Sequence, residues 1–144
     1  MANALFEKFR NGQLGLGSYT VIDFPSDTLK LALMDHAGAD GAPDIAADDF
    51  YDDVDGSLVG ALSSALGSIT VGTVAVGVVD AADLTPAFTG VTGASVESVV
   101  ALKDTGTPST SPLFGYWDTA TGLPLTPNGG DVNVTFNASG IFKF

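Results

Sequence analysis

Short apolar segments recur along most of the chain, and turn-forming residues separate them. In 132–136, Val132, Val134 and Phe136 alternate with Asn133 and Thr135, which is typical of a strand with one face on the core. Comparable segments complete a set of eight predicted strands, at 28–35, 68–73, 74–80, 84–88, 96–103, 113–118, 132–136 and 141–144. This spacing predicts an all-β, mainly antiparallel domain, a β-sandwich or jelly-roll-like barrel.

The N-terminal segment has a different period. Leu5, Phe6 and Phe9 follow helical spacing, and Gly12 is placed to end a helix, so we predict a short amphipathic helix over 2–11. We expect its apolar side to pack on the domain or on a neighbouring subunit. The predicted organisation is therefore an N-terminal helix and linking arm at 1–27, followed by a single β-sandwich domain at 28–144.

Residues 58–79 form a segment of twenty-two residues without a charge, which is long enough to cross a bilayer as a helix. Aspartates flank it on both sides, however, and no Lys or Arg anchors either end. Four glycines lie among its Ser, Thr and Val residues, a mixture that favours short strands and turns. We therefore expect no membrane-spanning helix and no membrane partner.

The charge balance narrows the possible partners. Seventeen acidic residues against five basic ones give a formal net charge of -12, whereas binding to phosphate backbones requires a cationic surface. We therefore expect no nucleic-acid partner. The chain of 144 residues has no cysteine, so disulfides and thiolate metal sites are excluded, which is compatible with a cytoplasmic assembly site.

The search for catalytic or cofactor-binding residues gives no candidate. His36 is the single histidine and lies among turn-forming residues, so we expect an exposed loop histidine. The chain has no nucleophile motif of the G-x-S-x-G type and no phosphate-binding glycine motif. We therefore predict no enzymatic activity, no catalytic residue and no cofactor.

Eight aspartates and no basic residue lie between Asp35 and Asp55. The sequence around Asp53 and Asp55 resembles the middle of a calcium-binding loop, but Tyr51 and Leu62 occupy positions where that loop requires carboxylates. We therefore predict a solvated acidic loop without a tight metal site. A weak divalent site at a subunit junction remains an alternative, using Asp48, Asp49, Asp52, Asp53 and Asp55.

The segment before the strand at 132–136 is rich in turn residues. Pro124 and Pro127 fix φ and lack a backbone donor, while Gly129 and Gly130 allow conformations that a side chain would obstruct. We predict a rigid crossing between strands that shapes an exposed rim of the domain.

Several segments together resemble a family of small virion structural proteins of tailed bacteriophages. They are "MANALFEKFR", "SDTLKLALMD", the block "VVDAADLTPAFTGVTGASVESVVALKDTGTPSTSPLFGYWDTATGLPLTPNGGDVNVTF" and the closing "GIFKF". Family members have an "MANALY"-like start, a "DTIKVALVD"-like strand, a "KDTGT…SPL…D…TGLPVTPNGGD" block and an "IFKL"-like end in the same order. The likeness extends over most of the chain, and its most specific part is 103–131. The chain departs most in the aspartate-rich insert before Phe50 and in the link 12–25.

The resemblance implies a non-enzymatic virion component. We favour a capsid cement or decoration protein on the capsid exterior, which binds the major capsid protein or other virion proteins and forms a homo-oligomer, most simply a trimer. A tail-associated or head-tail junction protein is the nearest alternative. The predicted interface residues come from the helix and the rim: Leu5, Phe6, Phe9, Leu123, Pro124 and Pro127.

A carbohydrate-binding β-sandwich module is a second alternative, because Tyr116 and Trp117 could stack on sugars. Adjacent residues of a strand point to opposite faces, so these two rings are not expected to form one platform. We expect one ring in the core and the other at a surface or interface. A hydrolase is less consistent still, since its carboxylates would come from distant aspartates without an acid–base partner.

Overall fold

The computed structural model describes residues 3–17, 19 and 21–144, and it is an all-β, antiparallel domain with one short α-helix. All eight predicted strands are present, most of them shorter than predicted, and one additional strand precedes the helix. The strands are β1 (Ala4–Leu5), β2 (Leu29–Met34), β3 (Thr70–Val71), β4 (Val78–Asp80), β5 (Leu84–Phe88), β6 (Ser98–Lys103), β7 (Leu113–Trp117), β8 (Val132–Val134) and β9 (Phe142–Lys143). The helices are α1 (Glu7–Gln13) and the 3₁₀ turns η1 (Tyr51–Asp53), η2 (Asp55–Ser57) and η3 (Pro108–Thr110).

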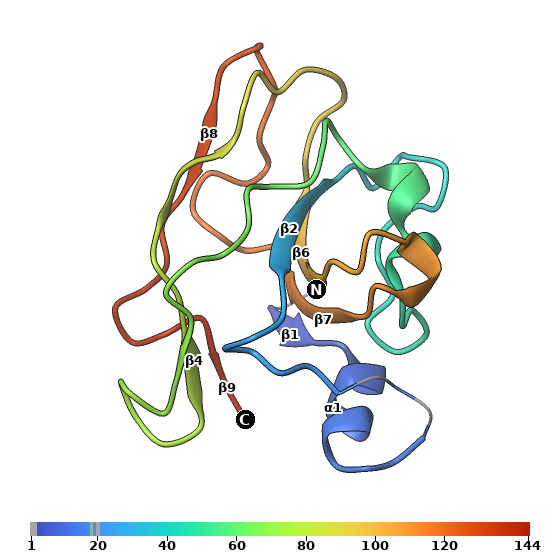
Figure 1. Ribbon diagram of the computed structural model, residues 1–144. Helices are drawn as coiled ribbons and strands as arrows, with labels where there is room; N and C mark the ends of the chain where they lie inside the picture. The colour runs from blue at the N-terminus through green and yellow to red at the C-terminus, as the bar shows by residue number, and fades with distance from the viewer. Residues whose placement is uncertain (1–2, 18, 20) are drawn as a thin grey trace.

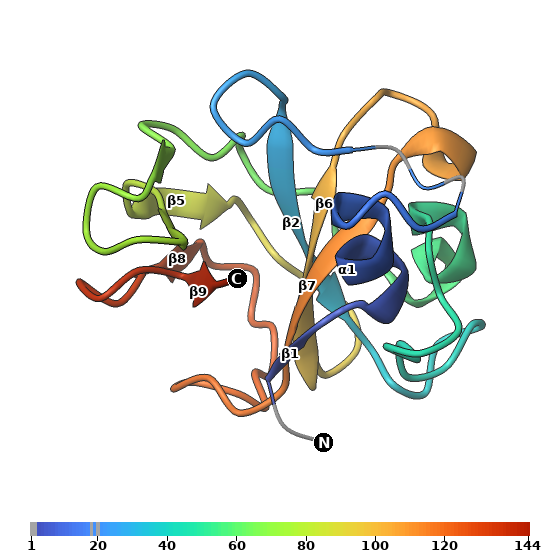
Figure 2. The same ribbon diagram turned by 90° about the horizontal axis from the view of Figure 1, so that it is seen from below.

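The strands form three antiparallel sheets, with orders β1-β7-β6-β2, β3-β4-β9 and β5-β8. Figure 1 shows how they are arranged, and Figure 2 shows the four-stranded sheet in the middle of the molecule. The strands β5, β8 and β9 lie on one side of this sheet and α1 lies on the other (Figure 2). The central sheet is therefore covered on both faces.

This double coverage explains why the central strands do not alternate in polarity. Four consecutive residues of β2, from Leu31 to Met34, are buried, and so are four consecutive residues of β7. A strand buried on both faces needs apolar side chains at successive positions. In β8, by contrast, Val132 and Val134 pack against the core while Asn133 is exposed, which confirms the predicted alternation.

The uncharged segment 58–79 does not form a helix. Its first part runs along the outer edge of β2, where the backbone N–H groups of Val59 and Ser63 donate to the carbonyls of Leu33 and Leu31 at 2.8 and 2.9 Å. Its second part forms β3, a turn and the start of β4. None of the helices that the structure describes is long and apolar enough to cross a membrane.

The N-terminal segment differs from the prediction. Ala4 and Leu5 form a strand paired with Gly115 and Tyr116 of β7, and α1 begins only at Glu7. The predicted position Ala2 lies outside the described residues. Pairing with β7 satisfies the backbone of this segment, which a helix could not do at the sheet edge. The described residues Ala4 and Leu5 of the predicted arm thus add a strand to the central sheet.

Phe6 and Phe9 are completely buried inside the domain, with 0% of their surface exposed. Phe9 packs at 5.9 Å between ring centroids from both Phe24 and Phe114, and at 5.6 Å from Phe144. The prediction that Phe6 and Phe9 belong to a subunit interface is therefore wrong. Helical spacing identified an apolar side of the segment, but that side faces the core of the same chain.

The ring cluster around Phe9 gives a direct test of this packing. Phe9→Ala is expected to lower the free energy of unfolding by about 3–5 kcal/mol, because it leaves a cavity among rings contributed by both ends of the chain. Phe144→Ala is the matched control, and a clearly smaller loss is expected because 54% of Phe144 is already exposed. Denaturant unfolding of both variants measures the difference. Equal losses would contradict the interior position of Phe9.

Candidate interaction surfaces

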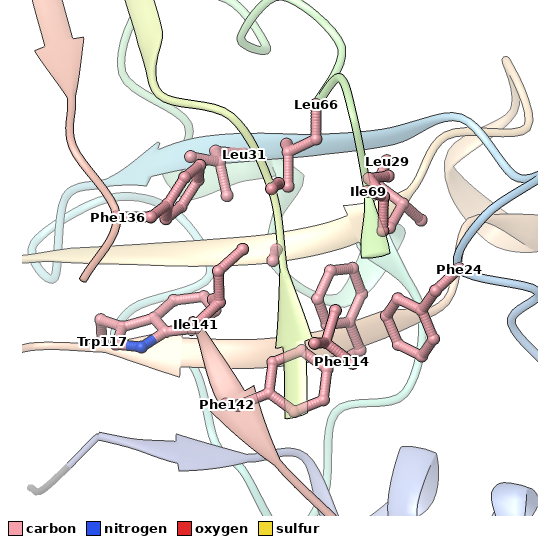
Figure 3. Close-up of a pocket in the computed structure, with 13 residues that line it drawn as sticks. Phe24, Leu29, Leu31, Leu66, Ile69, Phe114, Trp117, Phe136, Ile141 and Phe142 are labelled. Atoms are coloured by element: carbon pink, nitrogen blue, oxygen red, sulfur yellow. The ribbon is translucent and has the colours of Figure 1, made fainter. Parts of the chain in front are cut away.

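The hollow between the central sheet and β4 and β9 is apolar and very small. Leu31, Trp117, Phe136 and Ile141 are among the side chains that line it (Figure 3), and its volume is about 10 Å³. This is about the space that one water molecule needs. The hollow is therefore a packing gap in the core rather than a ligand cavity.

A second, shallower hollow lies at the surface between 56–60 and 92–94, with a volume of about 130 Å³. Asp35 is the one titratable side chain among its lining residues, and its Oδ1 accepts a hydrogen bond from the backbone N–H of Ala37 at 2.8 Å. Four of the nine other lining residues are glycines. The described lining residues therefore supply a single carboxylate to this hollow.

His36 has a more defined setting than the sequence predicted. Its Nε2 lies 2.9 Å from the Ser98 hydroxyl, and its backbone N–H donates to Glu97 Oε2 at 3.0 Å. Hydrogen bonds from the Ser95 side chain and from the His36 backbone hold the pKa of Glu97 below its usual value. His36 is half-buried and not freely exposed, and its contacts join the end of β2 to the start of β6.

The aspartates of 35–55 are used mainly to hold turns. Asp53 Oδ2 accepts hydrogen bonds from the backbone N–H groups of Asp49 and Phe50 at 2.9 and 3.2 Å. Asp48 Oδ2 accepts from the N–H of Asp44 at 2.7 Å, and Asp40 Oδ2 from that of Gly56 at 2.6 Å. A short carboxylate side chain suits this task because it reaches the nearby backbone. The segment is thus ordered by its own acidic side chains.

This arrangement has an electrostatic cost. Burial raises the pKa of Asp48, and burial together with Asp53 raises the pKa of Asp49. Within the described part of the chain, no three His, Cys, Asp or Glu side chains are grouped so that they could hold a metal ion. The carboxylates of Asp48, Asp49, Asp52, Asp53 and Asp55 are therefore not brought together as a cation site.

Calcium binding can be tested by titration calorimetry. We expect no sub-micromolar site, because the carboxylates at Asp40, Asp48 and Asp53 accept hydrogen bonds from backbone groups and the terminal ligands of a calcium loop are missing. Asp53→Asn serves as a control, and it should leave the calorimetric trace unchanged. Tight binding that Asp53→Asn abolishes would refute this prediction.

Two ion pairs stabilise the end of the central sheet. Lys30 Nζ of β2 lies 2.7 Å from Asp104 Oδ2, and Lys103 Nζ of β6 lies 2.9 Å from Asp27 Oδ2. The hydrogen bond from Lys30, together with one from the backbone N–H of Gly106, holds the pKa of Asp104 below its usual value. The ionised carboxylate of Asp104 therefore stabilises the folded state. The ionised carboxylate of Asp48, by contrast, is destabilised by burial in the folded state.

Removal of the negative charge at Asp104 and at Asp48 should have opposite effects on the free energy of unfolding. Asp104→Asn should reduce the free energy of unfolding by about 1 kcal/mol near neutral pH, since it breaks the pair with Lys30. Asp48→Asn should increase it modestly, by less than about 1 kcal/mol, since the amide oxygen still accepts from Asp44 without the burial penalty.

The pH dependence follows from the directions of the two shifts. The wild-type contribution of Asp104 is complete above the unfolded pKa of about 3.9 and disappears as the pH falls through the lowered folded value. The raised pKa of Asp48 means that protonation relieves its cost as the pH falls. Both differences from wild type should therefore vanish in strong acid, as measured by denaturant unfolding at several pH values. A difference that persists there would show that packing, not charge, is responsible.

The predicted rim at 121–131 is exposed and is hydrogen-bonded to 90–96. Val96 and Leu125 exchange two backbone hydrogen bonds, at 2.8 and 2.9 Å. The backbone N–H of Gly129 donates to Val91 at 2.8 Å, and that of Val91 donates to Gly130 at 2.9 Å. Gly129 has a φ of +83°, which favours glycine. The crossing is thus fixed by backbone pairing, as a defined surface requires.

The interface residues predicted on this rim and at β1 have different exposures. Pro124 is exposed, whereas Leu5, Leu123 and Pro127 are half-buried, and Leu5 and Leu123 pack partly against the core. The structure therefore leaves Pro124 and the exposed parts of the other three side chains accessible.

Sequence reasoning missed an apolar surface around the turn between β3 and β4. We call it the hairpin face and define it by Val71, Val74, Val76 and Phe144, all of which are exposed. The backbone N–H of Phe144 donates to Gly77 at 3.0 Å, which fixes the end of β9 beside the turn. The strand predicted at 74–80 begins only at Val78, because 72–77 forms the turn. The lack of charged residues in 58–79 is the sequence feature from which the apolar turn of this surface could have been predicted.

The hairpin face and the acidic segment lie on different sides of the molecule. In Figures 1 and 2 the turn next to β4 is at the left, while the segment 35–55 is at the right. The domain therefore has an apolar turn on one side, with Asp80 and Lys143 on the strands next to it, and a strongly acidic segment on the other.

Comparison with known proteins adds no family to this description. No protein-family model matches the chain, and no curated protein matches it. The functional proposal therefore depends on the motifs of the sequence and on the surfaces of the fold.

Proposed function

We propose that the protein is a structural component of a tailed-phage virion, a capsid cement protein that binds outside the shell and links neighbouring major capsid protein subunits. It acts without catalysis and without a cofactor, and it assembles as a closed homo-oligomer, most simply a trimer. The observation that carries the proposal is the resemblance of the ordered motifs, above all of 103–131, to virion structural proteins. Closed symmetry matches the three-fold positions that a capsid offers.

The residues of that most specific block support a structural role. In its first half, Asp104 Oδ1 accepts from the backbone N–H of Gly106 at 2.9 Å, and the hydroxyls of Thr105 and Thr110 lie 2.6 Å apart. The Ser111 hydroxyl donates to the carbonyl of Thr107 at 2.8 Å. These contacts fix the loop between β6 and β7, just as backbone pairing fixes the rim. The motif thus specifies the shapes of two exposed loops, which is what a binding surface requires.

The two sides of the domain also suit a linking protein. A subunit that bridges neighbours must make contacts on more than one side, and each specific contact needs roughly 800 Å² or more per partner. The acidic side complements a basic surface, and electrostatic attraction would guide the protein to it. The hairpin face offers a contact of a different kind. A shell component that carries both surfaces can bind the shell and its own copies without competition.

The carbohydrate-binding alternative receives less support from the geometry. Tyr116 is buried and its hydroxyl lies 3.4 Å from Asp118 Oδ2, while Trp117 is half-buried and lines the core hollow (Figure 3). Their rings face opposite sides of β7, as expected of adjacent strand residues. Sugar-binding platforms use exposed aromatic faces, and these two rings do not supply one.

Particles that lack the protein provide the test of the cement function. Adding the purified protein to such shells should raise the temperature at which they release their genome, measured with a dye that fluoresces on nucleic acid, because each bound copy adds contacts between shell subunits. A density map of the restored particle should place the protein on the capsid exterior. Density only at the tail, or an unchanged release temperature, would overturn the proposal and favour the tail alternative.

A rim variant tests which surface meets the shell. Thr126 is an exposed residue of the rim, and Thr126→Glu should reduce binding to the shells while the free protein unfolds at an unchanged temperature. Thr135→Glu is the matched control, since Thr135 is exposed and lies outside both the rim and the loop between β6 and β7. Equal effects of the two substitutions would show that added charge, and not the rim, weakens binding.

A further inference from the structure

We infer that the hairpin face is the surface through which copies of this chain associate with one another. The face consists of Val71, Val74, Val76 and Phe144, and 87% of Val76 is exposed. The expectation of a trimer rests on the proposed function, whereas the choice of the hairpin face as the contact does not. It replaces the buried residues Phe6 and Phe9 as the apolar contact between subunits.

The first argument is the lack of charge on this edge of the sheet. β3 is the outer strand in the order β3-β4-β9, so one side of its backbone has no neighbour among the described strands. Edge strands of monomeric proteins are normally protected by short length, charged residues or proline. β3 is short, with two residues, but the segment 68–79 contains no charged residue and no proline. No charge therefore opposes the approach of another chain along the segment 68–79.

The conformation of the turn makes the apolar residues prominent. Gly72 and Gly77 have φ values of +74° and +77°, which bring the chain out of β3 and back into β4 with Val74 and Val76 at the tip. The backbone N–H of Gly72 donates to Val78 at 2.8 Å, and that of Val78 donates to Ala75 at 3.0 Å. The tip is therefore an ordered surface, and its ordering entropy is already lost before any partner binds.

The second argument concerns charge and identifies the occupant. With a formal net charge of -12, two copies repel each other wherever their carboxylates approach. The turn at 72–77 carries no charge, and the strands next to it carry one acidic and one basic residue, Asp80 opposite Thr70 and Lys143 opposite Val78. The acidic segment 35–55 lies on the other side of the molecule (Figures 1 and 2). Copies that meet through this face turn their acidic segments away from each other, which reduces the repulsion between them, and salt screens the remainder over about 8 Å at physiological ionic strength. A basic partner would instead prefer the acidic side.

Sedimentation velocity of the purified full chain over a range of concentrations tests this contact. We expect a concentration-dependent oligomer that Val76→Asp and Val76→Lys both weaken by about tenfold or more, because either charge must be desolvated in an apolar contact. Leu16→Asp is the control, since 61% of Leu16 is exposed and it lies in the segment after α1. Thermal unfolding of each variant verifies that the domain remains folded.

The outcomes separate the alternatives. Stronger association at higher salt supports an apolar contact between like-charged copies, whereas weaker association at higher salt contradicts it. A monomer at every concentration, or an oligomer sensitive to Leu16→Asp but not to the Val76 variants, would overturn the inference. A folded monomeric Val76 variant that still binds shells would leave the proposed function intact, so failure of the two ideas can be distinguished.

Discussion

The fold depends on the burial of the central sheet between two different coverings, and the phenylalanine cluster is where these coverings meet. Phe114 of β7 lies 5.9 Å from Phe9 of α1 and 5.9 Å from Phe142 of β9, between ring centroids. Both ends of the chain are thereby fixed against the same strand. Because β7 is buried on both faces, neither covering can be removed without exposing apolar surface to water. This packing also determines where the loops on either side of β7 lie.

Carboxylates form the second level of organisation, since the chain uses aspartate where many loops use backbone pairing. Asp83 and Asp131 accept hydrogen bonds from the backbone N–H groups of Phe136 and Gly90, at 2.8 and 2.9 Å, far along the sequence. Asp44, Asp48 and Asp53 do the same locally. The acidity of the chain is therefore partly a consequence of how its loops are held. The segment 58–79 has no charge and adds nothing to the repulsion that this creates.

The sequence predicted the strands well, because their apolar segments are bounded by turn residues. The segment 84–88 matches β5, and 28–35 and 113–118 contain β2 and β7 with little excess. The errors arise where tertiary contacts decide between local options. Leu5 satisfies helical spacing, yet pairing with Gly115 places it in a strand. The turn at 72–77 contains valines that favour a strand, but the two glycines with positive φ end the pairing.

The candidate surfaces were harder to predict, for a related reason. Periodicity shows that Phe6 and Phe9 share an apolar side, but it cannot show whether that side meets its own chain or another. The rim was predictable because proline and glycine specify exposed backbone directly. The hairpin face as a whole could not be predicted from sequence, since only the pairing of β4 with β9 brings the backbone of Phe144 to Gly77 of the turn. A single apolar turn is a weak signal in sequence. In the folded chain this turn lies next to a further exposed apolar residue, Phe144, and on the side opposite the acidic segment. The turn and Phe144 together form a surface through which two copies of an acidic protein can associate.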